Sequence, residues 1–170
     1  MVTPDIRRFA PGDLVGGAAE LLAAHIAETI GEHGRCRFGL AGGSTPRNVY
    51  EQLATLPVSW DDVQLFWGDD GHTASLFPGL ADLSTRHRVI AAQSPVAPND
   101  RVTLTIRAIN ESRAVYFLVS GSAKAARLAE VASEIASGRP RLPSAFVQPD
   151  SGQLIWLIDT HAATQLKGSD

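Results

Sequence analysis

The first strong pattern along the chain is a helical repeat of apolar residues near the N-terminus. Asp13 stands where a helix N-cap is favoured, and Gly34 stands where helices commonly end. Similar spacing predicts further helices over residues 44–56 and 123–137. The apolar positions of the first helix recur at steps of three and four residues and share one face: Leu14, Ala18, Leu21, Leu22, Ile26 and Ile30.

Short apolar runs between these helices predict strands. They lie at residues 36–41, 63–67, 89–92, 102–106, 115–119 and 154–158. Runs that are apolar throughout, such as 63–67, are typical of strands buried on both faces. The run at 102–106 instead alternates with threonines, so one of its faces is polar. Strands that alternate with helices predict an α/β fold with a mainly parallel sheet, and we expect one domain over residues 1–170.

Composition narrows the class of protein. The 170 residues are 44% hydrophobic and 19% charged, a balance typical of a globular domain. The net charge of −3 argues against binding to nucleic acid or to an anionic membrane surface. The single cysteine, Cys36, excludes an internal disulfide framework and fits a reducing compartment. No apolar run reaches the ~18 residues of a membrane span, so we expect a cytoplasmic protein.

The glycine turn Gly42-Gly43-Ser44-Thr45-Pro46 lies between a predicted strand and a predicted helix. Backbone N–H groups at such a turn can approach an anion, and the helix start adds partial positive charge. The Ser44 and Thr45 hydroxyls could donate two more hydrogen bonds. The alternative is an ordinary turn, with Ser44 or Thr45 as the helix cap and Pro46 in the first turn.

His72 lies in a turn-rich segment, residues 71–79, that follows an apolar strand. Ligands bind at strand ends in open α/β sheets, and a neutral imidazole can take a proton from water near neutral pH. Asp69 and Asp70 precede the histidine and could orient its ring. The alternative is a surface turn with solvated side chains.

Two cations are candidates for binding a phosphate. Arg101 opens a predicted strand, and Lys124 lies one turn into a helix that follows Gly121. Arginine binds phosphate through two N–H groups and lysine binds it as a point charge. The alternative for each is a solvated surface charge. Metal binding is not expected, because His33 and Cys36 lie close together without a second pair of ligands.

Together these segments resemble the 6-phosphogluconolactonase family, within a larger group that includes glucosamine-6-phosphate deaminases. The matching motifs stand in family order and cover nearly the whole chain: Gly-Gly-Ser-Thr-Pro at 42–46, Leu-Phe-Trp-Gly-Asp at 65–69, Asp-Gly-His-Thr-Ala-Ser-Leu-Phe-Pro-Gly at 70–79, Arg-Val-Thr-Leu-Thr at 101–105, Val-Ser-Gly-Ser-Ala-Lys at 119–124 and Trp-Leu-Ile-Asp at 156–159. The 70–79 motif is the most specific, because Ser75-Leu76-Phe77-Pro78 fits the lactonase branch. The resemblance implies a Rossmann-like open, mainly parallel sheet with helices on both faces.

The resemblance also implies an activity, the hydrolysis of 6-phospho-D-glucono-1,5-lactone to 6-phosphogluconate in the pentose phosphate pathway. It makes His72 the general base that activates water against the lactone carbonyl, and it places Asp69 in the same site. Lactone hydrolysis needs a positioned base and a stabilised oxyanion. We therefore expect no cofactor, no metal and no partner beyond a small sugar-phosphate lactone. The residues implied to bind the phosphate are Gly42, Gly43, Ser44, Thr45, Arg101 and Lys124.

One departure from the family pattern falls at residues 69–71. Several tens of residues, with helices and a central strand, usually separate the family's Gly-Asp-Glu-Arg segment from its Gly-His segment, but here Asp69 runs directly into Asp70-Gly71-His72. Losing a buried central strand would cost more than the ~5–15 kcal/mol that stabilises a domain. Either the protein holds further residues at this point, or the deletion is real and a swapped or repositioned strand compensates. We favour further residues, because the join falls inside two intact motifs, and we expect a break in the backbone between Asp69 and Gly71.

Two other functions stay open. A real deletion favours a non-catalytic sugar-phosphate-binding protein, because the missing strand and arginine would weaken preorganisation of the site. An aldose–ketose isomerase or deaminase is disfavoured by Ser75-Leu76-Phe77. The oligomeric state is open as well, although an unfilled sheet edge would favour self-association.

Overall fold

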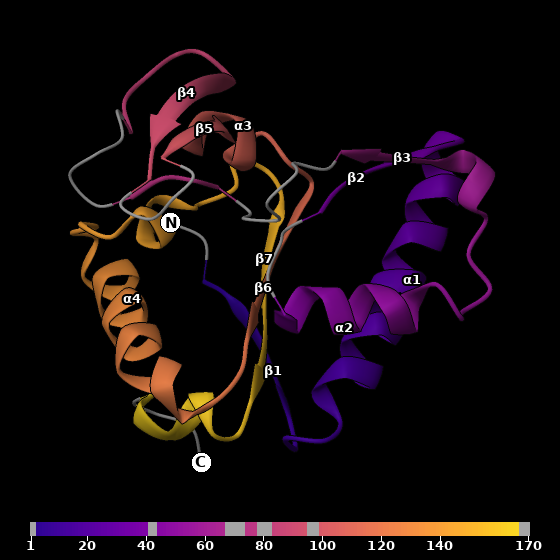
Figure 1. The fold of residues 1–170 in the computed structure, drawn as a ribbon, viewed down its shortest axis with the longest axis horizontal. Coiled ribbons are helices and arrows are strands. Elements are labelled where there is room, and N and C mark those ends of the chain that lie inside the picture. The colour runs from indigo at the N-terminus through magenta and orange to yellow at the C-terminus, as the bar shows by residue number, and fades with distance from the viewer. Residues whose placement is uncertain (1–2, 41–43, 67–73, 78–82, 95–98, 167–170) are drawn as a thin grey trace. The chain divides into compact units, whose positions relative to one another are not determined.

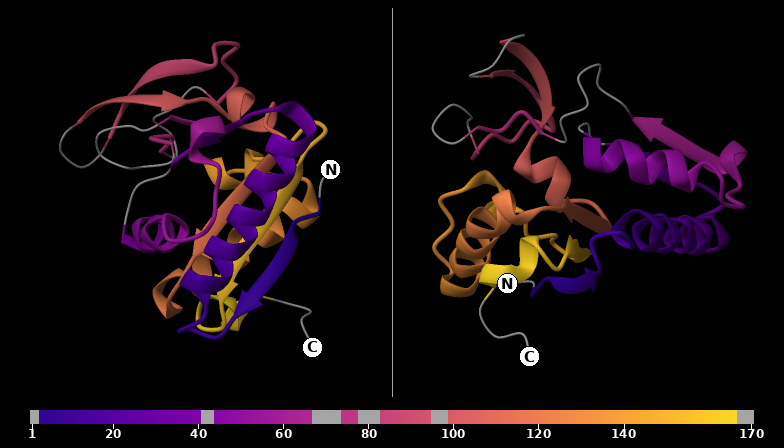
Figure 2. Two further views of the ribbon diagram at one scale, coloured as in Figure 1. Left: turned by 90° about the vertical axis from the view of Figure 1, so that its right-hand side faces the viewer. Right: turned by 60° about the horizontal axis from the view of Figure 1, so that its bottom comes forward.

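The computed structural model describes residues 3–40, 44–66, 74–77, 83–94 and 99–166. Two compact units make up the chain: unit 1 combines residues 1–11 with 74–170, and unit 2 comprises residues 12–73. Figure 1 and Figure 2 show the elements of both units. The single domain that we expect over residues 1–170 stays a prediction.

Unit 2 begins with helix α1 (Leu14–His33), whose predicted bounds are confirmed. Asp13 precedes the helix, although its side chain makes no capping hydrogen bond. Gly34 ends it with a φ of 71°, a left-handed conformation that glycine adopts without a steric penalty. The N–H of Gly34 donates to the Ile30 carbonyl at 2.7 Å, which satisfies one of the last carbonyls of the helix.

The strands of unit 2 form a two-stranded parallel sheet. Strand β2 (Cys36–Gly39) pairs with β3 (Val63–Phe66), and Cys36 lies opposite Val63. Between them run helix α2 (Ser44–Leu53), which contacts α1, and the short helix η1 (Trp60–Asp62). Both strands were predicted from their apolar runs.

Unit 1 is built on a three-stranded parallel sheet in which β7 (Gln153–Asp159) lies between β1 (Asp5–Phe9) and β6 (Ala114–Val119). Residues 154–159 of β7 are all buried, as expected of an apolar strand with a neighbour on each side. The sequence analysis located β6 and β7 but missed β1. The sequence of β1, Asp-Ile-Arg-Arg-Phe, lacks an apolar pattern because most of its side chains are exposed.

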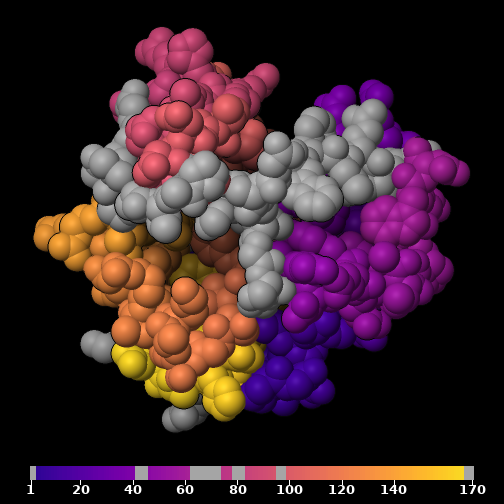
Figure 3. All heavy atoms as spheres, viewed as in Figure 1, coloured from indigo at the N-terminus to yellow at the C-terminus, as the bar shows by residue number. Residues whose placement is uncertain are grey.

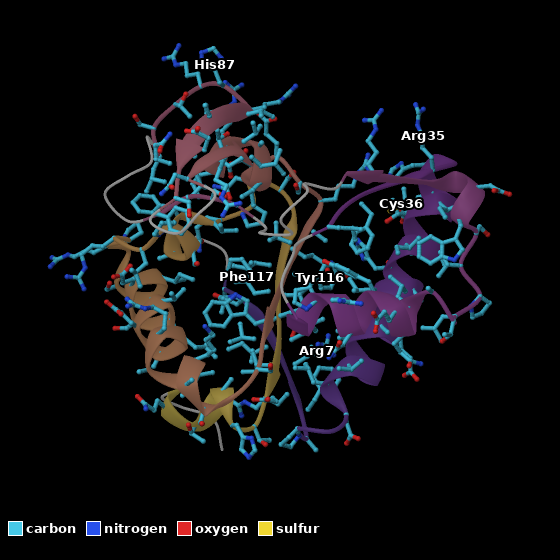
Figure 4. The ribbon with its side chains drawn as sticks, viewed as in Figure 1. Arg7, Arg35, Cys36, His87, Tyr116 and Phe117 are labelled. Atoms are coloured by element: carbon cyan, nitrogen blue, oxygen red, sulfur yellow. The ribbon has the colours of Figure 1, made fainter. Side chains whose placement is uncertain are left out.

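The core of unit 1 lies between this sheet and helix α4 (Ala125–Ser137), which ends at Gly138 as predicted. Phe117 of β6 points towards the α4 side of the sheet and Tyr116 points the other way, as alternation along a strand requires (Figure 4). The ring of Phe117 lies 6.1 Å from that of the fully buried Trp156. The short helix η4 (Ala162–Gln165) lies beside α4 on one face of unit 1 (Figure 3). The buried members of this core are Leu76, Ile106, Leu128, Val131, Ile135, Ala145, Val147, Leu154, Trp156, Ile158 and Ala162.

An antiparallel ribbon precedes β6 in the chain. Strands β4 (Val89–Gln93) and β5 (Asp100–Leu104) pair with Val89 opposite Leu104. The expected extension of this strand to residue 106 is wrong, because Thr105 caps helix α3 (Ile106–Asn110) by accepting the Ala108 N–H at 3.3 Å. The predicted α/β class with mainly parallel strands is confirmed, and the strands divide into two parallel sheets and this ribbon.

Candidate functional site

Lys124 lies in the turn that joins β6 to α4. The three-residue helix η2 (Ser122–Lys124) follows β6, and α4 begins at the next residue. The N–H of Lys124 donates to the Gly121 carbonyl at 3.1 Å, and the lysine side chain is exposed. None of the ion pairs between described residues involves Lys124. This arrangement leaves an ammonium group in solvent on a turn of defined backbone conformation.

A buried carboxylate holds the same turn from the neighbouring strand. Asp159, at the end of β7, is only 4% exposed. Its Oδ1 and Oδ2 accept the Gly121 N–H at 3.2 Å and 3.0 Å, and Oδ1 also accepts the Ala162 N–H at 2.7 Å. The sequence analysis gave Asp159 no role, because its contact with Gly121 joins residues 38 positions apart. An acidic residue at the end of an apolar strand was the one available signal.

These residues lie where the strands of unit 1 finish. Because β1, β6 and β7 are parallel, their carboxyl ends lie at one edge of the sheet, the edge at which open α/β sheets bind ligands. The Phe9 carbonyl accepts the Thr160 N–H at 3.0 Å, which ties the end of β1 to the residue after β7. The geometry at this edge is suited to an anion near Lys124.

The glycine turn is described only in part. Gly42 and Gly43 lie outside the described residues, as do the side chains of Ser44 and Thr45. Helix α2 begins at Ser44, and Pro46 lies in its first turn as predicted. A capping role for Ser44 or Thr45 stays a prediction. Anion binding by this turn stays a prediction.

The two expected catalytic residues, His72 and Asp69, also lie outside the described residues, and so does the expected backbone break between Asp69 and Gly71. The described segment 74–77 begins two residues after the histidine. Within it, the Ser75 N–H donates to Thr103 Oγ1 at 2.8 Å, and both residues are 4% exposed. This hydrogen bond fixes the segment that follows the histidine against β5.

Arg101 shares a face of β5 with Thr103, because side chains two residues apart in a strand point the same way. Thr103 is buried and Arg101 half-buried, whereas Val102 and Leu104 on the other face are 77% and 43% exposed. The predicted polar face is therefore the inner one. Strand β5 lies beside the end at which β6 begins, but Lys124 follows the end at which β6 finishes (Figures 1 and 2). The structure does not bring Arg101 and Lys124 together, and their joint role at a phosphate stays a prediction.

The arginines near the beginning of β6 are paired with a carboxylate. Glu111, directly after α3, accepts hydrogen bonds from Arg107 Nε at 2.9 Å and from Arg88 Nε at 2.7 Å. The hydrogen bonds from Arg107 and then Arg88 lower the pKa of the Glu111 carboxyl. His87, beside Arg88, projects outward at this end (Figure 4). Glu111 thus engages both guanidinium groups, whereas Lys124 takes part in none of the ion pairs between described residues.

Two other features are absent from the described part of the chain. It contains no helix that is long and apolar enough to cross a membrane. It also contains no group of three or more His, Cys, Asp or Glu residues that could hold a metal ion. Among the described residues, Lys124 and the groups that fix its turn are thus the candidate site for a ligand.

A family model described as glucosamine-6-phosphate isomerases/6-phosphogluconolactonase matches residues 10–70 and 68–156. The match comes in two pieces that share residues 68–70. This overlap lies at the place where the sequence departs from the family pattern, residues 69–71. The two pieces together cover most of the chain.

Individual proteins show the same similarity. The 6-phosphogluconolactonase of Rattus norvegicus is 42% identical over 114 residues, which span 66% of this chain but only 43% of the rat protein. That of Synechocystis sp. is 26% identical over 229 residues, spanning 91% of this chain and 94% of that protein. Because 229 exceeds the 170 residues of this chain, the Synechocystis protein has residues without a counterpart here.

A solved structure extends the likeness to the fold. The crystal structure of 6-phosphogluconolactonase from Thermotoga maritima has a TM-score of 0.75 and 20% identity, over 93% of this chain and 100% of that one. At this identity the likeness concerns the fold alone. The family match over two pieces that cover most of the sequence is the stronger observation. The chain belongs to the glucosamine-6-phosphate isomerase and 6-phosphogluconolactonase family.

Proposed function

We propose that the protein hydrolyses 6-phospho-D-glucono-1,5-lactone to 6-phosphogluconate, a step of the pentose phosphate pathway in the cytoplasm. One observation carries the proposal: the chain is 42% identical over 114 residues to a protein named 6-phosphogluconolactonase, and it keeps the motif Asp-Gly-His-Thr-Ala-Ser-Leu-Phe-Pro-Gly intact at 70–79. The exposed lysine at the carboxyl edge of the unit 1 sheet supports it, because the substrate carries a phosphate.

In this proposal His72 takes a proton from water, and the water oxygen forms a bond to the lactone carbonyl carbon. The carbonyl oxygen becomes an oxyanion, and hydrogen-bond donors lower the energy of that state. Collapse of the intermediate breaks the bond to the ring oxygen, which receives the proton from the imidazolium of His72. Asp69 lines the site. Lys124 binds the phosphate, with the turn at 42–45 as a further proposed ligand. Arg101 stays an expectation of the resemblance, because the structure does not bring it to Lys124.

Two variants test this assignment. His72→Ala should reduce hydrolysis to the spontaneous rate and leave the affinity for 6-phosphogluconate nearly unchanged, because the histidine moves a proton and does not bind the phosphate. Lys124→Ala should weaken that affinity about tenfold, the effect of losing one charge-assisted hydrogen bond. Hydrolysis is followed by acid release and affinity by calorimetry. Full activity in His72→Ala would refute the assigned base, and unchanged affinity in Lys124→Ala would refute the phosphate contact.

One observation favours a second function, the binding of a sugar phosphate without catalysis. The family match comes in two pieces, a relative has residues without a counterpart here, and the parallel strands fall into two separate sheets. A chain that lacks part of the family's sheet could keep a phosphate site and lose the alignment of base and lactone. For such a protein, 6-phosphogluconate would raise the Tm of a chain that shows no lactonase activity.

A further inference from the structure

We infer that Asp159 is a positioning residue for Lys124, an inference that rests on the phosphate-binding role proposed above. Asp159 need not touch the ligand. It fixes the backbone of the turn that carries the lysine, and it does so through main-chain groups only. Hydrogen bonds and the burial of the carboxylate support this role, and a second buried carboxylate serves as a comparison.

The hydrogen bonds form a two-step path from Asp159 to Lys124. The carboxylate accepts the Gly121 N–H with both oxygens, at 3.2 Å and 3.0 Å, and the Gly121 carbonyl accepts the Lys124 N–H at 3.1 Å. Gly121 has a φ of 88°, which glycine adopts without a steric penalty. Glycine can also adopt many other conformations, so its own flexibility does not fix this one. The charge-assisted bonds to Asp159 select this conformation. The turn therefore has a single defined conformation when the carboxylate is in place.

Burial makes this contact strong and leaves the lysine charge available. Asp159 is 4% exposed, and a buried carboxylate is costly unless hydrogen bonds compensate its charge. The Gly121 and Ala162 N–H groups supply that compensation. No ion pair between described residues involves Asp159. Asp159 thus orders the turn without neutralising the ammonium of Lys124, which is what binding of a phosphate requires.

A second buried carboxylate also holds a main-chain segment by accepting its N–H groups, away from this edge of the sheet. Glu134 of α4 is 5% exposed and accepts the N–H groups of Arg141 and Leu142, both at 2.8 Å. It fixes the connection that leaves the C-terminal end of α4, whereas Lys124 precedes the first residue of that helix. Glu134→Gln is therefore a control for Asp159→Asn. Each replaces a buried carboxylate that accepts two main-chain N–H groups, although Glu134 also accepts a hydrogen bond from Arg141 Nε at 3.2 Å, and only Asp159 is bonded to the turn that carries the lysine.

The test is calorimetric titration of the full 170-residue chain with 6-phosphogluconate, with gluconate as the ligand that lacks the phosphate. Asp159→Asn should weaken 6-phosphogluconate binding about tenfold, similarly to Lys124→Ala, because the amide cannot accept the Gly121 N–H with two oxygens. Asp159→Asn added to Lys124→Ala should cause little further loss. Glu134→Gln should lower the Tm and leave the affinity unchanged.

Gly121→Ala perturbs the same turn at the residue whose N–H donates to Asp159. No atom of the described residues lies within 4 Å of the added Cβ, so the substitution acts through its φ of 88° and not through a clash. It should also weaken binding of 6-phosphogluconate, which keeps the inference testable if Asp159→Asn fails to fold. If Asp159→Asn or Gly121→Ala binds 6-phosphogluconate with wild-type affinity and has a lowered Tm, Asp159 stabilises the fold only and the inference is contradicted. A wild-type chain that does not bind 6-phosphogluconate would instead refute the proposed function.

Discussion

The two ends of the three-stranded sheet in unit 1 are held by different chemistry. Where β6 and β7 begin, a neutral side chain joins the elements: Asn110 donates to the Phe146 carbonyl at 3.0 Å and accepts the Gln148 N–H at 2.8 Å. Where the strands finish, the charged Asp159 joins the turns. Each residue forms hydrogen bonds to a segment 36 or 38 positions away in the sequence. Each therefore holds the segment next to β6 against the segment next to β7.

The two ends differ in whether the cationic side chains near them form ion pairs with a carboxylate. At the beginning of the strands, Glu111 forms ion pairs with Arg88 and Arg107. At the finishing end the buried carboxylate is occupied by main-chain N–H groups, and Lys124 is exposed. The interactions at the beginning of the sheet thus stabilise the fold. Those at the finishing end also stabilise the fold, and there an exposed cation can bind a ligand. Substitutions of Gly152, Asn110 and Glu111, at the beginning of the strands, should change stability and leave the ligand affinity unchanged.

Gly152→Ala should give the largest loss of stability. Gly152 precedes β7, and a Cβ at this position would lie 2.6 Å from the Arg113 carbonyl oxygen, so backbone must move. We expect the free energy of unfolding in urea to fall by about 3 kcal/mol, the upper range for overpacking. Gly16→Ala in α1 is the control and should be neutral or slightly stabilising, because none of the described part of the chain comes within 4 Å of the new Cβ. A Gly152→Ala protein as stable as wild type would show that the strand start is not held closely.

Asn110→Ala should have the next largest effect. It removes both hydrogen bonds of the Asn110 side chain, from a half-buried site, and should lower the free energy of unfolding by about 2 kcal/mol. Asn110→Asp keeps an acceptor for Gln148 and loses the donor to Phe146, so its urea midpoint should lie between those of wild type and Asn110→Ala. Weakened binding of 6-phosphogluconate in Asn110→Ala would contradict the division of tasks between the two ends.

Glu111→Gln should give the smallest effect, and one that depends on pH. The bonds from Arg107 and Arg88 lower the pKa of Glu111 in the folded protein. Its carboxylate therefore stabilises the fold above its ordinary pKa, and this contribution is lost as the pH falls through the lowered value. The Tm of wild type should slightly exceed that of Glu111→Gln at pH 7, and the gap should close towards pH 3. Because the pair is solvent-exposed, 1 M salt should also reduce the gap. A gap that is constant with pH would mean that the charge of Glu111 is not responsible.

The elements that could be predicted were those whose local signals agree with their environment. Helix α1 has an apolar face and Gly34 at its end, and β7 is apolar along its length because it has a neighbour on each side. Strand β1 could not be found, because its pairing with β7 involves the backbone and leaves its charged side chains exposed. At residues 102–106 the alternating pattern concealed a cap: Thr105 ends the extended segment by accepting the Ala108 N–H.

The site was predicted in its components and not in its arrangement. The sequence predicted Lys124 one turn into a helix, but the structure places it in η2, directly before α4. Local sequence could not show that Asp159 reaches Gly121, since that contact depends on the parallel pairing of β6 with β7. It also could not show that β5, the strand of Arg101, lies beside the beginning of β6 (Figure 1), whereas Lys124 follows the end of β6. Roles for His72 and Asp69 still rest on the resemblance alone.

The most direct test of where the phosphate binds is hydrogen exchange of the wild-type chain, measured by mass spectrometry with and without 6-phosphogluconate. We predict slower exchange in peptides that cover residues 120–124 when the ligand is bound, because a ligand that binds the folded turn makes its opening rarer. Peptides that cover residues 106–113, at the beginning of β6, should exchange at unchanged rates. Unchanged exchange at 120–124, or slowing confined to 106–113, would contradict the claim that the finishing end of the sheet is the phosphate site.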